Sequence, residues 1–306
     1  MSKAHQAGYG QAMPELPEVE ITRRRIAPLL VGRALRRVYT SPDSYVFLTK
    51  PDRLRRLLRS RRFEALERRG KYLLGNLDDG SRLLLHLGMT GQLFARGVAS
   101  VRLLRRSARA ALGPEQTTAP FEPDAHTHLR LCFDDRGADV LFRDVRKFGK
   151  IQLLAPGSSC ARLERLGVDA LQATGGALFR ATRTRRASIK AVLLDQSVLA
   201  GAGNIYADEA LFLAGIHPER AASRLRREEC ADLVRQLRRV MRRSLETGGS
   251  SINDFIAPDG RDGGYQDERR VYGRSGRPCG RCGQRIRSTR VGQRTTHYCP
   301  RCQGAA

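Results

Sequence analysis

The stretch Met13-Pro14-Glu15-Leu16-Pro17-Glu18-Val19-Glu20 places a proline beside an acid, immediately ahead of a helix, near the start of the chain. If Met13 is the initiator and is removed, Pro14 carries a free secondary amine. Such an amine can attack a sugar carbon that is losing its base, giving an iminium that drives elimination at the neighbouring carbon. Glu15 would then donate a proton beside the nucleophile. The structural alternative is an ordinary helix start, where Pro and acids are favoured, and these eight residues alone fit it well.

Charge is the strongest feature of the composition. The 306 residues include 56 Lys and Arg against 31 Asp and Glu, a formal net charge of +25. In a chain with 41% hydrophobic residues, this excess indicates a polyanion partner and strongly salt-dependent binding. An Arg-rich proteome is the competing explanation, because Arg greatly outnumbers Lys. No apolar run is long enough to span a membrane. Because the charge is spread over the chain and not gathered on one amphipathic helix, we also expect no membrane partner.

Short apolar runs predict a β-rich domain over residues 13–156. At this spacing they are typical of a sandwich or barrel, preceded by a helix over 17–30. Residues 96–125 interrupt the series, and we interpret them as a long surface loop outside the core. Residues 1–12 lack the apolar segment of a signal peptide and are interpreted as a disordered extension or a mis-assigned start. The runs are 63–67, 72–74, 83–85, 129–133, 140–142 and 151–154.

The next part of the chain is mainly helical and predicts a second domain over residues 157–270. A helix over 188–199 ends in a Gly-rich turn, and Asn204 is predicted to cap the following helix, 205–214. In this helix-turn-helix-like unit, Asn204 and the free N–H groups beside it could hold a phosphate, although a Gly-x-Gly turn is weak evidence. A further amphipathic helix is predicted over 223–246.

Four of the seven cysteines form two CxxC knuckles separated by sixteen residues, which predicts a zinc finger over residues 271–306. Two knuckles at this distance supply four thiolates for one tetrahedral Zn²⁺, and the ion is structural because cysteine fills every position. His297 is therefore predicted to be a surface or packing residue. The four ligands are Cys279, Cys282, Cys299 and Cys302, and the remaining Cys132, Cys160 and Cys230 are predicted to be small buried hydrophobes.

Together these segments resemble the formamidopyrimidine-DNA glycosylase and endonuclease VIII family over residues 13–303. Leu16 and the Val-Glu that follows Pro17-Glu18 match the formamidopyrimidine branch, since the other branch typically has Gly in place of Leu16. The resemblance implies an α+β multidomain fold with double-stranded DNA in a cleft: an N-terminal β-sandwich with flanking helices, a helix-two-turns-helix domain and a C-terminal zinc-ribbon finger. The matching segments are MPELPEVE, GKYLL, HLGMTGQL, RKFGK, LAGAGNIYADEALFLAGIHPER and QRTTHYCPRC.

The resemblance also implies an activity: removal of oxidised purines, such as 8-oxoguanine and formamidopyrimidines, followed by strand cleavage through β- and δ-elimination. A damaged base must leave the stack, and wedging side chains fill the gap. By position, the implied catalytic residues are Pro14, Glu15, Lys71 and Arg294; the DNA-binding residues are His126, Arg146, Arg185 and Asn204; the gap-filling residues are Met89, Arg146 and Phe148. The structural alternatives are core packing for Met89 and Phe148 and an ordinary exposed lysine for Lys71.

Two departures from the family pattern bear on this reading. The residues before Met13 would place the Pro14 nitrogen in a peptide bond, and an amide nitrogen is no nucleophile. Either translation begins at Met13, or the extension is removed, or covalent catalysis is lost; we predict the first. Residues 96–125 look like an insertion. The competing functions are an endonuclease VIII-like glycosylase for oxidised pyrimidines and a non-catalytic binder of damaged DNA. We expect a monomer in the bacterial cytoplasm, associated with the nucleoid.

Overall fold

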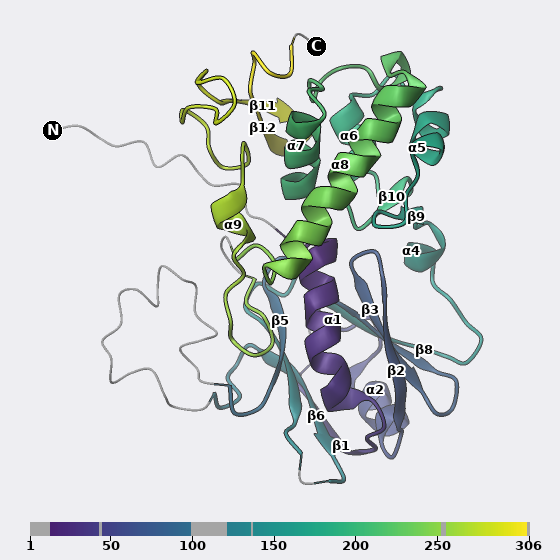
Figure 1. Ribbon diagram of the computed structural model, residues 1–306. Coiled ribbons are helices and arrows are strands. Elements are labelled where there is room, and N and C mark those ends of the chain that lie inside the picture. Colours follow the sequence, from purple (N-terminus) through teal and green to yellow (C-terminus); the bar gives the residue numbers. More distant parts are fainter. Residues whose placement is uncertain (1–12, 43–44, 99–120, 136, 252–254, 305–306) are drawn as a thin grey trace, which may run out of the picture.

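The computed structural model describes residues 13–42, 45–98, 121–135, 137–251 and 255–304. The predictions for residues 1–12 and for most of the 96–125 segment lie outside this part of the chain. A sheet-rich domain and a helical domain meet near the start of helix α1 (Leu16–Leu30), which runs down into the sheet-rich domain (Figure 1). None of the helices in the described ranges combines the length and the apolarity needed to cross a membrane.

The N-terminal domain contains two four-stranded antiparallel sheets. One has the order β1-β6-β7-β5 and the other the order β2-β3-β4-β8. All six predicted apolar runs lie in strands. The bounds are β1 Leu35–Thr40, β2 Phe63–Arg69, β3 Tyr72–Leu77, β4 Arg82–His86, β5 Gly91–Ala95, β6 Thr127–Phe133, β7 Val140–Asp144 and β8 Lys150–Leu154, with helix α2 at Pro51–Leu58.

The two sheets share one core, which confirms the predicted sandwich. Leu85 of one sheet and Phe142 of the other belong to the same buried cluster, and Ile26 adds the apolar face of α1. The expectation that residues 96–125 stay outside the core is wrong at one end, because Phe121 is buried edge-on against the Phe94 ring. A single aromatic at the end of a polar stretch gains more from burial than from remaining in water.

The helical domain has its own core around Tyr206 and Leu237. The predicted helix over 188–199 ends early, at Leu194, and the one over 223–246 begins late, at Arg227, after a short 3₁₀ turn. The bounds are α4 Ala161–Glu164, α5 Gly175–Thr182, α6 Ile189–Leu194, α7 Asn204–Leu213, α8 Arg227–Glu246 and α9 Tyr265–Glu268, with a short parallel pair β9 Val168–Asp169 and β10 Leu199–Ala200.

The C-terminal finger is an antiparallel hairpin, β11 (Arg287–Val291) and β12 (Arg294–Tyr298), attached to α7. The buried carboxylate of Glu209 on α7 accepts hydrogen bonds from the backbone N–H groups of Arg270, Val271 and Tyr272 at 2.9–3.1 Å. This one side chain satisfies three backbone donors at the entry to the finger. The finger is thereby fixed to the helical domain, and all three predicted parts of the fold are present.

Candidate active site

The N-terminus of α1 and the N-terminus of α7 meet in direct contact. The Leu16 N–H donates to the Gly201 carbonyl at 3.1 Å, and the Ile205 N–H donates to Oε1 of Glu15 at 3.0 Å. Gly203 makes the approach possible, because a Cβ at this position would lie 2.1 Å from Cδ of Glu15. The prediction of Asn204 as N-cap is therefore wrong: Gly203 is the cap, and a carboxylate 190 positions earlier in the chain takes the place of a capping side chain.

Glu15 is buried with an unusual protonation equilibrium. Burial raises the pKa of its carboxyl, the Lys71 ammonium lowers it, and the neighbouring Glu18 raises it, with a result of about 7. The Ile205 N–H at the positive end of α7 stabilises the ionised form but does not outweigh burial. A carboxyl group with this pKa can hold a proton at neutral pH and release it during a reaction.

Lys71 and Arg294 lie on the same cavity as Glu15, although they come from the β-sandwich and the finger. The cavity, of about 660 Å³, is lined by Met13, Glu15, Lys71, Asn204 and Arg294, among others. Lys71 is only 7% exposed, so the reading of an ordinary surface lysine is wrong. Burial lowers the pKa of the Lys71 amine, Glu15 opposes this shift, and the charge of Arg294 adds to it. The amine is thus closer to its neutral form than a surface lysine.

Pro14 is buried between Met13 and Glu15, both of which line this cavity. Behind it, Glu18 fixes the start of α1. Its carboxylate accepts from the Glu15 N–H at 3.0 Å, from the Tyr206 hydroxyl at 2.6 Å and from the Ser250 N–H at 3.0 Å. Sequence reasoning treated Glu18 only as a helix-start acid; its three partners come from both domains and hold Pro14 in place.

The three predicted gap-filling residues lie on two adjoining loops that meet at Asp144. Met89 precedes β5, and Arg146 and Phe148 follow β7, which pairs with β5. The buried Asp144 carboxylate accepts from the Thr90 hydroxyl, from the Arg146 N–H at 3.2 Å and from the Gly149 N–H at 2.7 Å.

These loops touch closely at their tips. A Cβ on Gly88, which has φ +63°, would lie 2.5 Å from the Phe148 backbone. Phe148 itself is 45% exposed, with the Arg146 guanidinium 4.7 Å from the ring centroid. The core-packing alternative is therefore wrong for Phe148, while Met89 is half-buried.

Two further predicted residues lie outside the cavity lining. His126 is half-buried immediately before β6, where its carbonyl accepts from the Asp144 N–H at 2.9 Å, so it adjoins the gap-filling loops. Arg185 follows α5 and pairs with Asp195 at 2.6 Å. Asp195 does line the cavity, so Arg185 flanks it. Asn204 lines the cavity directly and donates from Nδ2 to the Thr295 carbonyl of the finger at 3.0 Å.

Sequence reasoning missed His86, Arg162 and Arg165 on the same cavity. Burial and the nearby Lys71 lower the pKa of His86 to about 4, so the ring is neutral and its Nδ1 accepts the Gly88 N–H at 3.2 Å. His86 stood within the HLGMTGQL segment and could have been singled out there. The two arginines lie in and just after the short helix α4, where no motif marks them.

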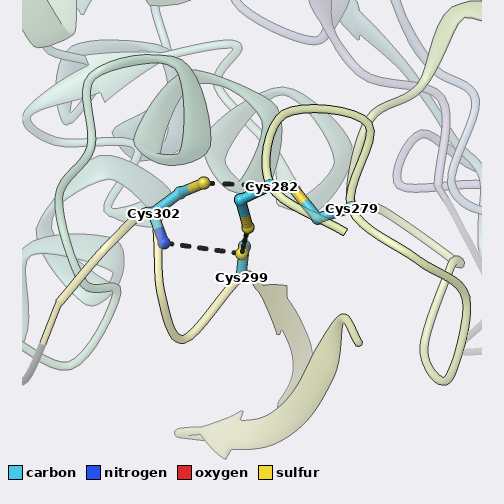
Figure 2. A group of neighbouring side chains, drawn as sticks. All are labelled: Cys279, Cys282, Cys299 and Cys302. Atoms are coloured by element: carbon cyan, nitrogen blue, oxygen red, sulfur yellow. Dashed lines mark hydrogen bonds between the residues drawn. The ribbon is translucent and has the colours of Figure 1, made fainter. Parts of the chain in front are cut away.

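The four finger cysteines are gathered in one cluster, as Figure 2 shows. Their Sγ atoms lie within 4.8 Å of one another, with 3.9 Å between Cys279 and Cys302 and 3.5 Å between Cys282 and Cys299. A tetrahedral zinc with bonds of about 2.3 Å places sulfur atoms about 3.8 Å apart. The cluster fits one structural Zn²⁺, as predicted. Cys132 and Cys230 are buried as expected, whereas Cys160 is half-exposed.

A buried ion pair connects the finger with the helical domain. Lys190 and Asp208 are fully buried and lie 2.5 Å apart. Lys190 also donates to the Thr296 hydroxyl of β12 at 2.7 Å, and Asp208 accepts from the His297 N–H at 2.8 Å. His297 also packs against Tyr272, in keeping with its predicted packing role. These contacts set the position of β12, which begins at Arg294.

Models of known protein families match three successive parts of the chain. The formamidopyrimidine-DNA glycosylase N-terminal domain matches residues 13–151, the H2TH domain of the same enzymes matches 166–256, and a zinc finger found in FPG and IleRS matches 276–304. The matches cover the sandwich, the helical domain and the cysteine cluster in turn.

Relatives match over nearly the full length. The formamidopyrimidine-DNA glycosylase of Neisseria meningitidis is 39% identical over 95% of this chain and 100% of its own. The crystal structure of the MutM (Fpg) protein from Thermus thermophilus has a TM-score of 0.79 at 38% identity, covering 96% of this chain and 100% of that one. A Lactococcus lactis Fpg mutant in complex with Fapy-dG-containing DNA has a TM-score of 0.80 at 31% identity, covering 95% and 100%. The chain belongs to the formamidopyrimidine-DNA glycosylase family.

Proposed function

We propose that this protein is a bifunctional DNA glycosylase and abasic-site lyase of base excision repair. Its substrates are 8-oxoguanine and formamidopyrimidines in double-stranded DNA, and the nucleophile is the amine of Pro14 in the form that begins after Met13. The observation that carries the proposal is the single cavity bordered by Glu15, Lys71 and Arg294 beside Pro14. Solved relatives support the substrate class, since they include MutM in complex with carbocyclic 8-oxo-G-containing DNA, with a TM-score of 0.79 at 32% identity.

The chemistry assigns one task to each of these residues. The Pro14 nitrogen attacks C1′ of the damaged nucleotide, the bond to the base breaks, and Glu15 provides the proton that the opening sugar requires. In the resulting iminium, loss of a proton from C2′ expels the 3′ phosphate. Lys71, whose pKa is lowered by burial, is suited to this proton transfer. A second elimination expels the 5′ phosphate beside Arg294, and hydrolysis of the iminium frees Pro14.

Extruding the damaged base leaves a gap in the duplex, which the loops anchored on Asp144 are placed to fill. The exposed Phe148 ring and the Met89 side chain act as wedges, and the Arg146 guanidinium can donate hydrogen bonds to the orphaned base. His126, Arg185 and Asn204 would contact phosphates around the cavity. The domain limits at 13–156, 157–270 and 271–306, the monomeric state and the nucleoid location stay predictions.

One observation favours a second candidate function, a non-catalytic binder of damaged DNA. In the 306-residue chain, Met13 acylates the Pro14 nitrogen and so removes the nucleophile. An endonuclease VIII-like glycosylase acting on oxidised pyrimidines is the remaining alternative. Comparing the cleavage of duplexes that contain 8-oxoguanine with those that contain thymine glycol distinguishes it from the purine-specific enzyme.

Borohydride trapping on a duplex with 8-oxoguanine opposite cytosine tests the proposal. Protein expressed from Met13, with removal of Met13 confirmed by mass spectrometry, is compared with the full 306-residue chain. We expect a covalent adduct from the short form alone, because only its Pro14 amine can form an iminium that borohydride reduces. Tight binding of the lesion duplex by the short form, without any adduct, would overturn the catalytic proposal in favour of the binder.

A further inference from the structure

The N-terminal domain has a second basic surface, far from the candidate active site. A cavity of about 690 Å³ lies between α2 and β1, and among the described residues six arginines and one acid, Asp52, border it. We call it the α2–β1 surface; its arginines are Arg36, Arg37, Arg55, Arg56, Arg59 and Arg130.

Most of this charge is uncompensated. Asp52 pairs with Arg55, and Asp139 pairs with Arg130 at 2.7 Å. Arg36, Arg56 and Arg59 are exposed and make no ion pair within the part of the chain that the structure describes. Gathering like charges destabilises a fold through self-repulsion, so a concentrated, unpaired cluster points to an anionic partner.

Tyr39 gives this surface a second recognition element. The side chain is 43% exposed, and the Arg37 and Arg130 guanidinium carbons lie 5.5 Å and 5.3 Å from its ring centroid. The Arg37 guanidinium also donates to the Tyr39 hydroxyl at 2.8 Å. One guanidinium group can donate two parallel hydrogen bonds to the oxygens of a phosphate, and a nucleobase can stack on an exposed aromatic ring. An acidic peptide would use the arginines but not the ring, so the surface fits nucleic acid better.

This surface is separate from the candidate active site. β1 is the edge strand opposite β5 in its sheet, whereas the gap-filling loops adjoin β5 and β7. The α2–β1 cavity shares no bordering residue with the cavity around Glu15. In Figure 1, α2 and β1 lie at the lower end of the molecule, away from the helical domain. A duplex held between the domains leaves this surface free.

The geometry points to a second DNA-binding site: the α2–β1 surface binds the phosphodiester backbone of a DNA segment other than the one in the active site. The protein can then hold two segments at once, or stay attached to neighbouring DNA while the damaged strand is processed. The proposal goes beyond glycosylase activity, because it requires no chemistry at Pro14. The competing explanation is that the arginines reflect only the general Arg content of the chain.

The test uses the full chain with its cleft first saturated by an unlabelled duplex that carries a stable abasic-site analogue. Undamaged fluorescent DNA, in single-stranded and in duplex form, is then titrated against this complex and followed by anisotropy over a salt series. Wild type is compared with the triple variant Arg36→Ser, Arg56→Ser, Arg59→Ser. A matched control removes three arginines of the helical domain that are exposed and make no ion pair with any described residue: Arg224→Ser, Arg239→Ser, Arg242→Ser.

We expect the second DNA to bind the wild-type complex and the control, and to bind the triple variant about tenfold or more weakly. The slope of log affinity against log salt should fall by about 2 to 3 in the triple variant, since each lost phosphate contact contributes about 0.9. Affinity for the abasic-analogue duplex should not change. A Tyr39→Ala variant that weakens only the single-stranded probe would assign that form as the ligand.

Three results would each overturn the proposal. The first is that the second DNA fails to bind the wild-type complex, the second is that the two triple variants lose equal affinity for it, and the third is that polyglutamate binds the α2–β1 surface more tightly than DNA does. Failure of the abasic-analogue duplex to bind would instead count against the proposed function. In that case the labelled DNA alone, titrated against the same two triple variants, still decides on the α2–β1 surface.

Discussion

At the scale of single residues, the protonation of Glu15 governs the proposed chemistry. Burial raises the pKa of its carboxyl, Lys71 lowers it and Glu18 raises it, to about 7. A proton donor works in its acid form, which predominates below the pKa and is lost as the pH rises through it. Loss of the Glu15 acid form is therefore expected to make base release decline as the pH rises above 7.

Replacing Lys71 with methionine is expected to move this decline to higher pH. The substitution removes a cation that favours ionised Glu15, so the pKa of Glu15 rises and the acid form survives to higher pH. Strand cleavage should also slow, by about a hundredfold or more, because the proposed proton-transfer group of β-elimination is lost. Single-turnover base release measured across pH checks the shift, and strand cleavage on the same substrate checks the rate, with the exposed Lys50→Met as control. If base release declines at the same pH in Lys71→Met as in wild type, the proposed electrostatic effect of Lys71 on the pKa of Glu15 is wrong.

Asp144 is expected to act as a positioning residue for the gap-filling loops. In Asp144→Asn, one acceptor oxygen becomes an NH₂ group that faces the donors of Thr90, Arg146 or Gly149. An unsatisfied buried donor costs about 1–3 kcal/mol, which appears as a lower melting temperature. Release of 8-oxoguanine should fall about tenfold or more, whereas cleavage of a preformed abasic site should suffer less, because no base must be extruded.

The exposed Asp134→Asn serves as the control for this substitution. Equal losses on the two substrates would mean that Asp144 supports the fold alone and does not position the loops. A purely structural residue lowers both rates together, whereas a residue that holds the gap-filling loops affects the step that needs them.

At the scale of the elements, the strands that were predicted and those that were not differ in their local sequence. Every apolar run became a strand, but β1 and β5 were not predicted; these are the two edge strands of one sheet. Position at a sheet edge does not explain this, because β2 and β8, the edge strands of the other sheet, were both predicted from their apolar runs. β1, LRRVYT, has two exposed arginines, and β5, GQLFA, begins with glycine.

The start of α7 shows why the site was only partly predictable. The local sequence predicted Asn204 as the cap of α7. Instead, the Ile205 N–H donates to the carboxylate of Glu15, which belongs to the other domain. Local pattern cannot show a partner 190 positions away. The residue that signals the contact is Gly203, since only glycine leaves room for Glu15.

Substituting Gly203 with alanine is expected to abolish base release, by about a hundredfold or more, while the protein stays folded. The added Cβ would lie 2.1 Å from Cδ of Glu15, so the carboxyl group has to move away from its hydrogen bond to Ile205. Small displacements of catalytic groups are costly in rate. Gly176→Ala is the matched control, because a Cβ there meets nothing closer than 3.7 Å. Wild-type rates in Gly203→Ala would refute the requirement for this contact.

At the scale of the whole molecule, each domain could be predicted by itself, but the contacts between them could not. The cysteine spacing and the apolar runs are local signals, and each led to its own unit. Nothing in the sequence indicated that Lys190, Asp208 and Glu18 are buried and paired, because a charged residue in a helical segment is normally exposed to solvent. Their partners lie in other parts of the fold, so only the assembled structure reveals that they are buried and paired.

The finger and the active site are joined through β12, so removing zinc is expected to disable δ-elimination. A two-stranded hairpin is not stable alone, and without the ion Arg294 is no longer held at the cavity. Chelation should weaken lesion-duplex binding about tenfold or more and abolish the δ-elimination product, and added Zn²⁺ should restore both. Arg294→Ala should instead keep the β-elimination product and lose only the δ product, as seen on a sequencing gel. As a control, Cys160→Ser should behave as wild type, because Cys160 lies outside the cluster. If protein whose loss of zinc has been verified still forms the δ-elimination product, Arg294 acts without the folded finger and the prediction is wrong.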